Sequence, residues 1–464
     1  MTTESRLESV SLGVPPALDL LGLPKGWSWT NLVEVAEFFN GDRSSNYPKQ
    51  ADFVVEGIPF VNTGHIDPTG RLALNEMDYI SRACFDRLRG GKLKSGDIVY
   101  CLRGSTIGKI ARVDLNEGAI ASSLVIIRPK ANIAQDYLYY FLSSPLGQRL
   151  VRQHDNGSAQ PNLSVQAISK YPLPLPTIAE QREMLAVLNS FDDKIEQNRR
   201  TGRKLEELAR AVFKAWFVDF EPVKAKAAGA AGFPGMPGEI FACLPNILKE
   251  SPIGPVPEGW MVKPISEAFD VNPPRRLAKG ADAPYLDMKN MPTTGHAPDA
   301  WERRPHGSGM KFINGDTLVA RITPCLENGK TAYVDFLNDG EVAWGSTEYI
   351  VLRTKPPLPP IFAYCLARME PFRDFAIQNM SGTSGRQRVA ASAMEHYRIA
   401  VPDPATARSF GEVVEPQFLY IRASKAESAK LATLRDYLLP RLLSGRVRVR
   451  HSQLSDVHRV GPNP

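Results

Sequence analysis

Pro24-Lys25-Gly26-Trp27, near the start of the chain, returns as Pro257-Glu258-Gly259-Trp260 in its second half. A second pair follows in the same order, because Gly96-Asp97-Ile98-Val99 returns as Gly315-Asp316-Thr317-Leu318. The two offsets are 233 and 219 residues, so insertions and deletions separate the copies. A repeat of this size predicts two similar globular domains in one polypeptide, which suits a partner with two half-sites.

Short apolar runs bounded by turn residues predict a sheet in the first copy. They cover residues 57–61, 96–100 and 122–127, with β-branched side chains between Gly, Asp and Ser. Residues 136–150 carry apolar side chains at helical spacing. We therefore expect a domain of the α+β class over residues 23–176.

The second copy repeats the strand pattern. Ile126-Ile127-Arg128 returns as Val351-Leu352-Arg353, an offset of 225. We place the second domain over residues 257–402.

Each copy ends in a long amphipathic segment. Pro176 ends the last strand of the first copy, and Thr177 with Glu180 forms a capping-box pattern. Apolar residues then follow at partly heptad spacing, so we predict one helix over residues 177–218 and a second over 403–445. Two such helices in one chain can pack as a coiled coil.

Three polar or small residues interrupt the seam of the first helix, namely Asp192, Arg199 and Gly202, so we expect a kink or phase shift there. Pro416 lies inside the second helix and predicts a kink or a break near Glu415.

Three further segments complete the organisation. Residues 1–22 read as an N-terminal extension, 219–256 as a linker rich in Ala, Gly and Pro, and 446–464 as a basic tail.

Bulk composition limits the classes of protein. The chain has 464 residues, is 43% hydrophobic and contains no apolar run near the roughly 20 residues needed to span a bilayer. Five scattered cysteines without a Cys-x-x-Cys pair argue against disulfides and zinc and favour the cytoplasm. A formal charge of +6 permits nucleic-acid binding but does not require it.

Several short motifs are incomplete. Gly104-Ser105-Thr106-Ile107-Gly108-Lys109 is one residue short of a phosphate-binding loop, and Ile110 replaces the required Ser or Thr. Asn328-Gly329-Lys330-Thr331 has Pro324 in place of the first glycine. Asn272-Pro273-Pro274-Arg275 lacks the aromatic residue of an amino-methyltransferase, and no G-x-G-x-x-G exists. The seven histidines lack metal-ligand spacing. We therefore expect no catalysis in this chain, and neither a cofactor nor a metal.

The order of the motifs resembles the DNA-specificity (S) subunit of Type I restriction–modification systems. The segments that carry the resemblance are residues 23–27, 253–260, 174–176 with 180–182, 192–198, 215–220 and 438–445. One departure is that residues 403–410 lack the Glu-Gln-Arg of residues 180–182.

The resemblance implies two target-recognition domains joined by helices packed as an antiparallel coiled coil. Each domain would read one half of a bipartite site in double-stranded DNA. Two modification (methyltransferase) subunits would supply S-adenosylmethionine and adenine methylation, and restriction (translocase/nuclease) subunits would use ATP and magnesium. The chain itself would be a non-catalytic recognition subunit. A rod between the readers would act as a ruler, and lengthening it by one turn of roughly 5 Å would shift the spacer by one or two base pairs.

Base readout needs Arg or Lys for guanine and Asn or Gln for adenine on exposed loops. In the first domain the candidates are Asn62, Thr63, Arg71, Arg103, Ser105, Lys109, Gln160 and Asn162. In the second they are Lys289, Arg303, Arg304, Arg321, Asn328, Lys330, Arg386, Gln387 and Arg388. The equivalent loops 157–162 and 382–388 rank highest, since glycine allows close approach of the backbone.

Two alternatives stay open at this point. Each candidate residue can be an ordinary solvated charge or turn former, and the lysines would hold phosphate more often than read a base. The whole chain can also be a coiled-coil scaffold whose duplicated domains bind protein. A self-contained methyltransferase or nuclease is disfavoured by the absent cofactor loop. The DNA sequence and the spacer length do not follow from the residues.

Overall fold

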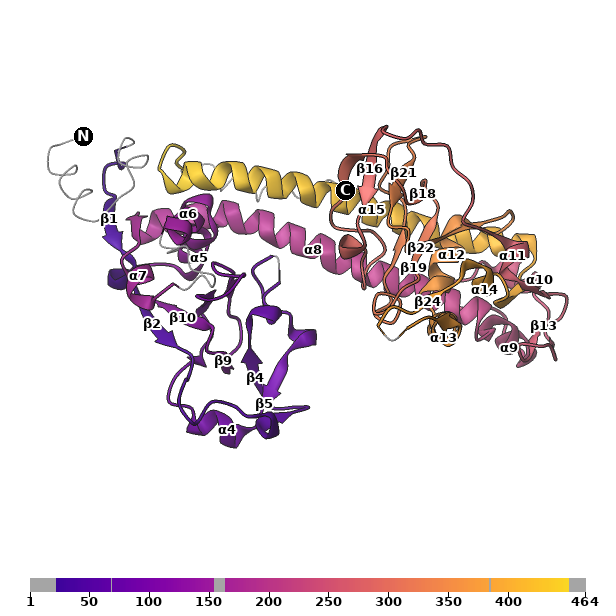
Figure 1. The fold of residues 1–464 in the computed structure, drawn as a ribbon, viewed down its shortest axis with the longest axis horizontal. Coiled ribbons are helices and arrows are strands. Elements are labelled where there is room, and N and C mark those ends of the chain that lie inside the picture. Colours follow the sequence, from indigo (N-terminus) through magenta and orange to yellow (C-terminus); the bar gives the residue numbers. More distant parts are fainter. Residues whose placement is uncertain (1–21, 68, 154–162, 384, 450–464) are drawn as a thin grey trace. The chain divides into compact units, whose positions relative to one another are not determined.

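The computed structural model describes residues 22–67, 69–153, 163–383 and 385–449. The chain divides into two compact units (Figure 1): unit 1 comprises Met1–Ile195 and Ala429–Pro464, and unit 2 comprises Glu196–Ser428. Each unit contains one globular lobe. The strands of the first lobe run from Ser28 to Leu175, and those of the second lobe from Met261 to Val401. Helices and strands are mixed in both, which confirms the α+β class.

The first lobe is built on two sheets. One is antiparallel in the order β2 (Ala36–Asn40), β10 (Leu124–Pro129), β7 (Ile98–Cys101) and β8 (Ile110–Arg112). The other has the order β3 (Phe53–Val54), β5 (Asp78–Ile80), β4 (Ile58–Val61), β9 (Gly118–Ile120) and β6 (Lys92–Leu93), with β4 and β9 parallel. A strand pair closes the lobe, formed by β1 (Ser28–Asn31) and β11 (Pro172–Leu175). Its helices are α3 (Leu32–Val35), α4 (Arg82–Arg87), α5 (Gln135–Ser143), α6 (Pro145–Gln153) and α7 (Val165–Ser169).

The second lobe has the same connectivity. Its antiparallel sheet has the order β15 (Phe269–Val271), β22 (Tyr349–Thr354), β19 (Thr317–Ala320) and β20 (Thr331–Tyr333). Its mixed sheet has the order β17 (Glu302–Pro305), β16 (Asp282–Leu286), β21 (Ala343–Gly345) and β18 (Met310–Phe312), with β16 and β21 parallel. The closing pair is β14 (Met261–Pro264) and β25 (Arg398–Val401). The lobe's helices are α11 (Ile265–Ala268), α12 (Pro360–Ala367), α13 (Glu370–Gln378) and α14 (Ala391–Met394), and a short pair, β23 (Met380–Ser381) and β24 (Arg388–Val389), precedes α14. Strand for strand, only β3 lacks a counterpart in the mixed sheets, so the topology agrees with the sequence repeat.

A buried ion pair recurs in both lobes. In the first, Arg128 on β10 contacts Asp97, which is 1% exposed, through Nε at 2.7 Å. In the second, Arg353 on β22 contacts Asp316, which is 0% exposed, through Nη1 at 2.8 Å. Each aspartate also accepts a backbone N–H three residues before it, at 2.8 and 2.9 Å. The repeated Gly-Asp motif is therefore a turn whose carboxylate ties two central strands together.

Two helices of 40 residues follow the lobes, α8 (Ile178–Phe217) and α15 (Pro404–Leu443). They contact each other inside each unit. In unit 1, Asp192 Oδ1 accepts a hydrogen bond from Arg435 Nη1 at 2.7 Å. In unit 2, Asn198 Nδ2 donates to Glu427 Oε2 at 2.7 Å.

Both helices are continuous through the residues at which the sequence suggested an irregularity. α15 continues through Pro416, so the expectation of a break there is wrong. Val414 and Phe418 on either side are buried in the core of unit 2, and this packing holds the helix together. α8 continues through Gly202, where a Cβ atom would lie 3.3 Å from Ile421 Cγ2. The glycine therefore allows close approach of the two helices.

The stretch 219–256, expected as a linker, carries elements of its own. They are α9 (Glu221–Ala227), α10 (Gly238–Cys243) and β12 (Leu248–Lys249), which pairs with β13 (Val256–Pro257). Val223 and Phe241 are buried in the core of unit 2. The stretch thus contributes to that core as well as joining the first helix to the second lobe.

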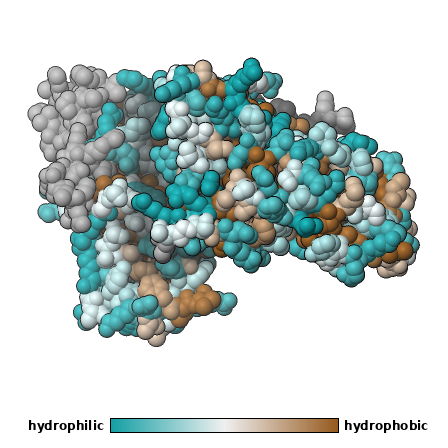
Figure 2. All heavy atoms as spheres, turned by 45° about the vertical axis from the view of Figure 1, so that its right-hand side comes forward, coloured by the Kyte–Doolittle hydropathy of each residue, from teal (hydrophilic) through white to brown (hydrophobic). Residues whose placement is uncertain are grey.

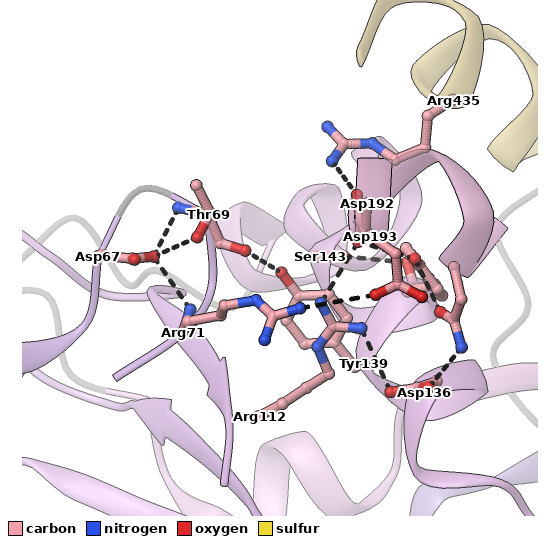
Figure 3. Close-up of polar contacts among 12 residues, drawn as sticks. Asp67, Thr69, Arg71, Arg112, Asp136, Tyr139, Ser143, Asp192, Asp193 and Arg435 are labelled. Atoms are coloured by element: carbon pink, nitrogen blue, oxygen red, sulfur yellow. Dashed lines mark hydrogen bonds and ion pairs between the residues drawn. The ribbon is translucent and has the colours of Figure 1, made fainter. Parts of the chain in front are cut away.

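In unit 1 a polar network attaches the first lobe to the helices (Figure 3). Arg112 on β8 is 10% exposed and contacts Asp136 and Asp192, each at 3.3 Å. Asp192 also accepts from Tyr140 at 2.8 Å and from Arg435. Burial pushes the pKa of Arg112 down, but the facing tyrosines and carboxylates push it up by more. The guanidinium therefore stays charged while nearly enclosed.

In unit 2 a different polar network attaches the second lobe to α8. The Tyr364 hydroxyl on α12 donates to Glu206 Oε1 on α8 at 2.5 Å. Arg368 Nε donates to the same hydroxyl at 3.1 Å, and its terminal nitrogens donate to the carbonyls of Thr293 and Thr331 at 2.7 and 2.8 Å. The buried Glu206 carboxylate is thus linked to the turns of the second lobe.

Most of the viewed surface is hydrophilic, and apolar side chains form only small patches on it (Figure 2). Among the described helices none is long and apolar enough to cross a membrane.

Replacing Tyr364 with Phe should lower the free energy of unfolding of unit 2 by about 2 kcal/mol, because a buried carboxylate loses its donor. Thermal unfolding and hydrogen exchange of α12 measure this. The matched control is Tyr100→Phe, since the buried Tyr100 hydroxyl has no hydrogen-bond partner among the described residues. That control should change stability by less than about 0.5 kcal/mol. Equal effects of the two variants would contradict the role given to Tyr364.

Asp316→Asn should destabilise the second lobe by about 2 kcal/mol, because Arg353 and Arg275 both lose their charged partner. Asp282→Asn is the control, since the Asp282 side chain is 63% exposed. It should cost less than about 0.5 kcal/mol. Hydrogen exchange of β19 and β22 would report the difference, and unchanged protection in Asp316→Asn would refute it.

Candidate nucleic-acid interface

Three of the residues expected at the interface of the first lobe lie together where β4 ends. Asn62 caps the single turn Thr63–His65 by accepting from the Gly64 N–H at 2.7 Å. Its Nδ2 donates to Asp78 at 3.1 Å. Lys109, at the end of the β7–β8 turn, donates to the Thr63 carbonyl at 2.9 Å. The turn after β4 and the β7–β8 turn are therefore held against each other.

The second lobe repeats this arrangement. Asp287 caps the turn Met288–Asn290 by accepting from the Lys289 N–H at 3.0 Å. Lys330, at the end of the β19–β20 turn, donates to the Met288 carbonyl at 2.7 Å. Lys109 and Lys330 are equivalent clamps, and each ammonium group has donors left for another acceptor. The Lys289 side chain is exposed.

A second basic group in the first lobe consists of Arg43 and Arg103. Arg103 and Ser105 are exposed on the β7–β8 turn, and Arg43 Nη2 donates to the Ser122 carbonyl at 3.2 Å. The pKa of Arg43 is lowered, first by burial and second by the positive charge of Arg103. Among the described residues no carboxylate lies within 4.0 Å of either guanidinium. Two unneutralised cations on one surface attract an anion.

At the equivalent turn of the second lobe, the arginines share a carboxylate. Arg388 contacts Glu348 through Nε at 2.9 Å and Nη2 at 2.8 Å, and Arg321 Nε lies 3.9 Å from the same carboxylate. These hydrogen bonds raise the pKa of Arg388. Thr323 and Gln387 exchange hydrogen bonds at 3.0 and 3.1 Å, which joins the β19–β20 turn to the loop 382–388. Six of the expected residues thus lie on or beside one joined pair of turns, namely Arg321, Asn328, Lys330, Arg386, Gln387 and Arg388.

Three expected residues lie outside these groups. Arg303 on the edge strand β17 contacts Asp282 and Glu341, each at 2.7 Å, and Arg304 lies over the Tyr285 ring at 4.4 Å. Arg71 belongs to the network in Figure 3, where it faces Asp193 at 3.9 Å. All three therefore have partners within their own unit.

The remaining expected residues divide between the loops. Arg386 is exposed and Asn328 is exposed, while Gln387 is half-buried. Gln160 and Asn162 lie outside the described residues, as does Ser384 in the loop 382–388.

The sequence interpretation missed two residues. Glu348 was passed over because only donors for base edges were sought, and Arg43 because it precedes the first recognised strand. The repeat could have drawn attention to Glu348, because an offset of 225 places this charged residue opposite Ser123 of the first copy. Leu102 N–H donates to the Ser123 carbonyl and Arg321 N–H to the Glu348 carbonyl, each at 3.0 Å, so the two positions are structurally equivalent.

Chemically, these surfaces can donate hydrogen bonds to anions and to base edges. Guanidinium, ammonium and amide groups gather on turns in both lobes. Among the described residues no group of three His, Cys, Asp or Glu side chains could hold a metal ion.

The chain is similar to known proteins along most of its length. Residues 24–207 match the model of the Type I restriction modification DNA specificity domain. The Type I restriction enzyme MjaIX specificity subunit of Methanocaldococcus jannaschii is 25% identical over 93% of this chain and 96% of its own. The HindI specificity subunit of Haemophilus influenzae is 23% identical over 89% of this chain and 99% of its own.

One solved structure shares the fold. It is the S subunit of a Type I restriction–modification system from M. genitalium, with a TM-score of 0.52 and 15% identity over 91% of this chain and 98% of that chain. Residues 24–207 thus match a Type I restriction modification DNA specificity domain, and over most of its length the chain is similar to specificity subunits of Type I restriction enzymes.

Proposed function

We propose that each lobe reads one half of a bipartite site in double-stranded DNA. The observation that carries this proposal is the repeated pair of turns, clamped by Lys109 in one lobe and by Lys330 in the other. Rigid turns that present Arg, Lys and Asn side chains suit the major groove, where each base pair offers a distinct pattern of donors and acceptors. Two equivalent readers in one chain suit a split site.

The residues proposed to contact DNA fall into two sets. Those on the clamped turns and their neighbouring loops are Asn62, Thr63, Arg103, Ser105, Lys109, Lys289, Arg321, Asn328, Lys330, Arg386, Gln387 and Arg388. The engaged residues Arg71, Arg303 and Arg304, and Gln160 and Asn162 outside the described residues, remain candidates from sequence. Lysines with remaining donors would hold phosphate, which fixes register without reading bases.

The two long helices would pair as an antiparallel coiled coil and set the spacer between the half-sites. Contacts within each unit support this pairing. In unit 2, positions rise from Asn198 to Trp216 on α8 while their partners fall from Glu427 to Phe410 on α15. In unit 1, Asp192 continues the trend with Arg435. A helix of 40 residues is about 60 Å long.

The helices would also dock two modification subunits. Exposed apolar side chains on α15 support an interface with protein, because apolar groups that gather on a surface often mark a protein-contact site. In unit 2 these are Leu419 and Tyr420, which are 63% and 49% exposed, and in unit 1 they are Leu434 and Tyr437, 50% and 56% exposed. The modification subunits would use S-adenosylmethionine, and restriction subunits would use ATP and magnesium. This chain would determine which DNA sequence the complex binds and would not itself be catalytic.

The complex of this chain with its methyltransferase subunits should bind one split motif, and affinity should fall steeply with salt. About six phosphate contacts would cost roughly a thousandfold between about 50 and about 200 mM salt. Selection from a pool of random duplexes, followed by titration at two salt concentrations, measures both. Methylome sequencing of the host with and without the gene is the independent check. Binding that ignores sequence, or recovery of no methyltransferase, would favour a protein-binding scaffold.

Lengthening both helices should lengthen the preferred spacer. Seven residues inserted after Ile195 and after Ser428, where each helix passes between units, add about 10 Å and nearly preserve the helical face. The spacer should then grow by about three base pairs, at about 3.4 Å per pair.

Selection of duplexes with variable spacers gives the readout. The control inserts seven Gly and Ser residues in the exposed stretch 229–232 and should leave the spacer unchanged. An unchanged spacer in the lengthened variant would refute the ruler.

A further inference from the structure

The Arg388 guanidinium pairs with a carboxylate along one edge only. Its Nε and Nη2 both face the Glu348 carboxylate, at 2.9 and 2.8 Å, so the pair is side-on. Nη1 donates once, to the Arg386 carbonyl at 3.2 Å. A guanidinium has five N–H donors. One N–H therefore remains on each of the two terminal nitrogens, on a side chain that is 42% exposed.

Arg82, another exposed arginine paired with a glutamate, presents its donors differently. Arg82 meets Glu117 end-on, with Nη1 and Nη2 at 2.8 and 2.6 Å from its two oxygens. Arg388 differs because its carboxylate fixes the group without covering its end.

The backbone around Arg388 is also fixed. Ile322 and Arg388 form a β-bridge, and the Val389 N–H donates to the Arg321 carbonyl at 2.9 Å. Gly385 has a φ of +79°, which only glycine adopts readily, and turns the loop just before Arg386. Because both the backbone and the guanidinium group of Arg388 are fixed, the side chain loses little conformational entropy when it binds.

The net charge around the Arg388 guanidinium stays positive, which favours binding of a hydrogen-bond acceptor. Glu348 alone would cancel Arg388, but Arg321 adds a second positive charge 3.9 Å from the same carboxylate. The three side chains carry a net charge of +1. Two donors with a net positive charge match guanine, whose O6 and N7 are both acceptors in the major groove, whereas adenine offers one acceptor and one donor.

We propose that Arg388 reads a guanine in the half-site of the second lobe and that Glu348 is the residue that positions it. This inference rests on the proposed function and deepens it, because it assigns one base to one side chain. In the first lobe Ser123 occupies the position of Glu348, so that lobe lacks the same device.

The test uses the full chain with its methyltransferase subunits and a pool of duplexes with random half-sites. The wild type should select a motif with a guanine that Arg388→Ala no longer prefers, and discrimination at that single position should fall about tenfold. Glu348→Gln should weaken the same preference by about threefold and leave every other position unchanged. Arg82→Ala, which removes an exposed arginine paired with a glutamate, should change no preference.

A modified base separates readout from a structural role. Replacing that guanine by 7-deazaguanine removes N7 and should weaken wild-type binding about fivefold, with no further loss in Arg388→Ala. Loss of affinity in Arg388→Ala that is equal for all sequences would show a phosphate contact or a structural role and would overturn the inference. So would an additive effect of 7-deazaguanine. A wild type that selects no motif would instead refute the proposed function.

Discussion

The buried Asp–Arg pair of each lobe is the constraint on which the proposed DNA-binding surface depends. Asp97 and Asp316 are almost completely enclosed, and a buried carboxylate is stable only when charge and hydrogen bonds compensate it. Arg128 and Arg353 supply both, from the neighbouring strands β10 and β22. The pair aligns β7 with β10 and β19 with β22. The turns at the far ends of β7 and β19, which carry Arg103 and Arg321, are therefore presented by a fixed frame.

One frame supports two different surfaces. The lysine clamp and the aspartate turn recur in both lobes, whereas the residues between them differ. Ser123 and Glu348 occupy equivalent positions, and their surroundings follow from that difference: Arg43 and Arg103 stay unneutralised in the first lobe, while Arg321 and Arg388 share a carboxylate in the second. Loops can change their chemistry on a rigid scaffold without loss of the core. Two lobes of one topology thus present different surfaces, as the proposed reading of two different half-sites requires.

Features that follow a local pattern could be predicted from the sequence, whereas the ion-pair partners of the candidate arginines could not. Gly96-Asp97 and its repeat, the capping box at Thr177 and the long helices could all be read locally. Arg303 and Arg388 looked alike in the sequence, but the partners that distinguish them, Glu341 and Glu348, lie 38 and 40 residues away. Such pairings depend on strand register, which no local pattern gives. The break at Pro416 was wrong because tertiary packing outweighs the loss of one backbone hydrogen bond.

The proposed ruler would require each lobe to be fixed firmly to the helices, and the two lobes are attached in different ways. The first lobe is held through Arg112 on β8, with Asp192 and Arg435 from the helices. The second is held through Tyr364 on α12, with Glu206 from α8. The two hubs share a tyrosine on equivalent helices, since an offset of 225 places Tyr364 on α12 opposite Tyr139 on α5, but their charged partners differ. Both bury charge, and a buried charge with all its partners in place tolerates little displacement, because moving it would leave an unpaired ion in a low-dielectric interior. Rigidity at the attachment is therefore supplied by electrostatics, while the apolar cores of the lobes supply stability.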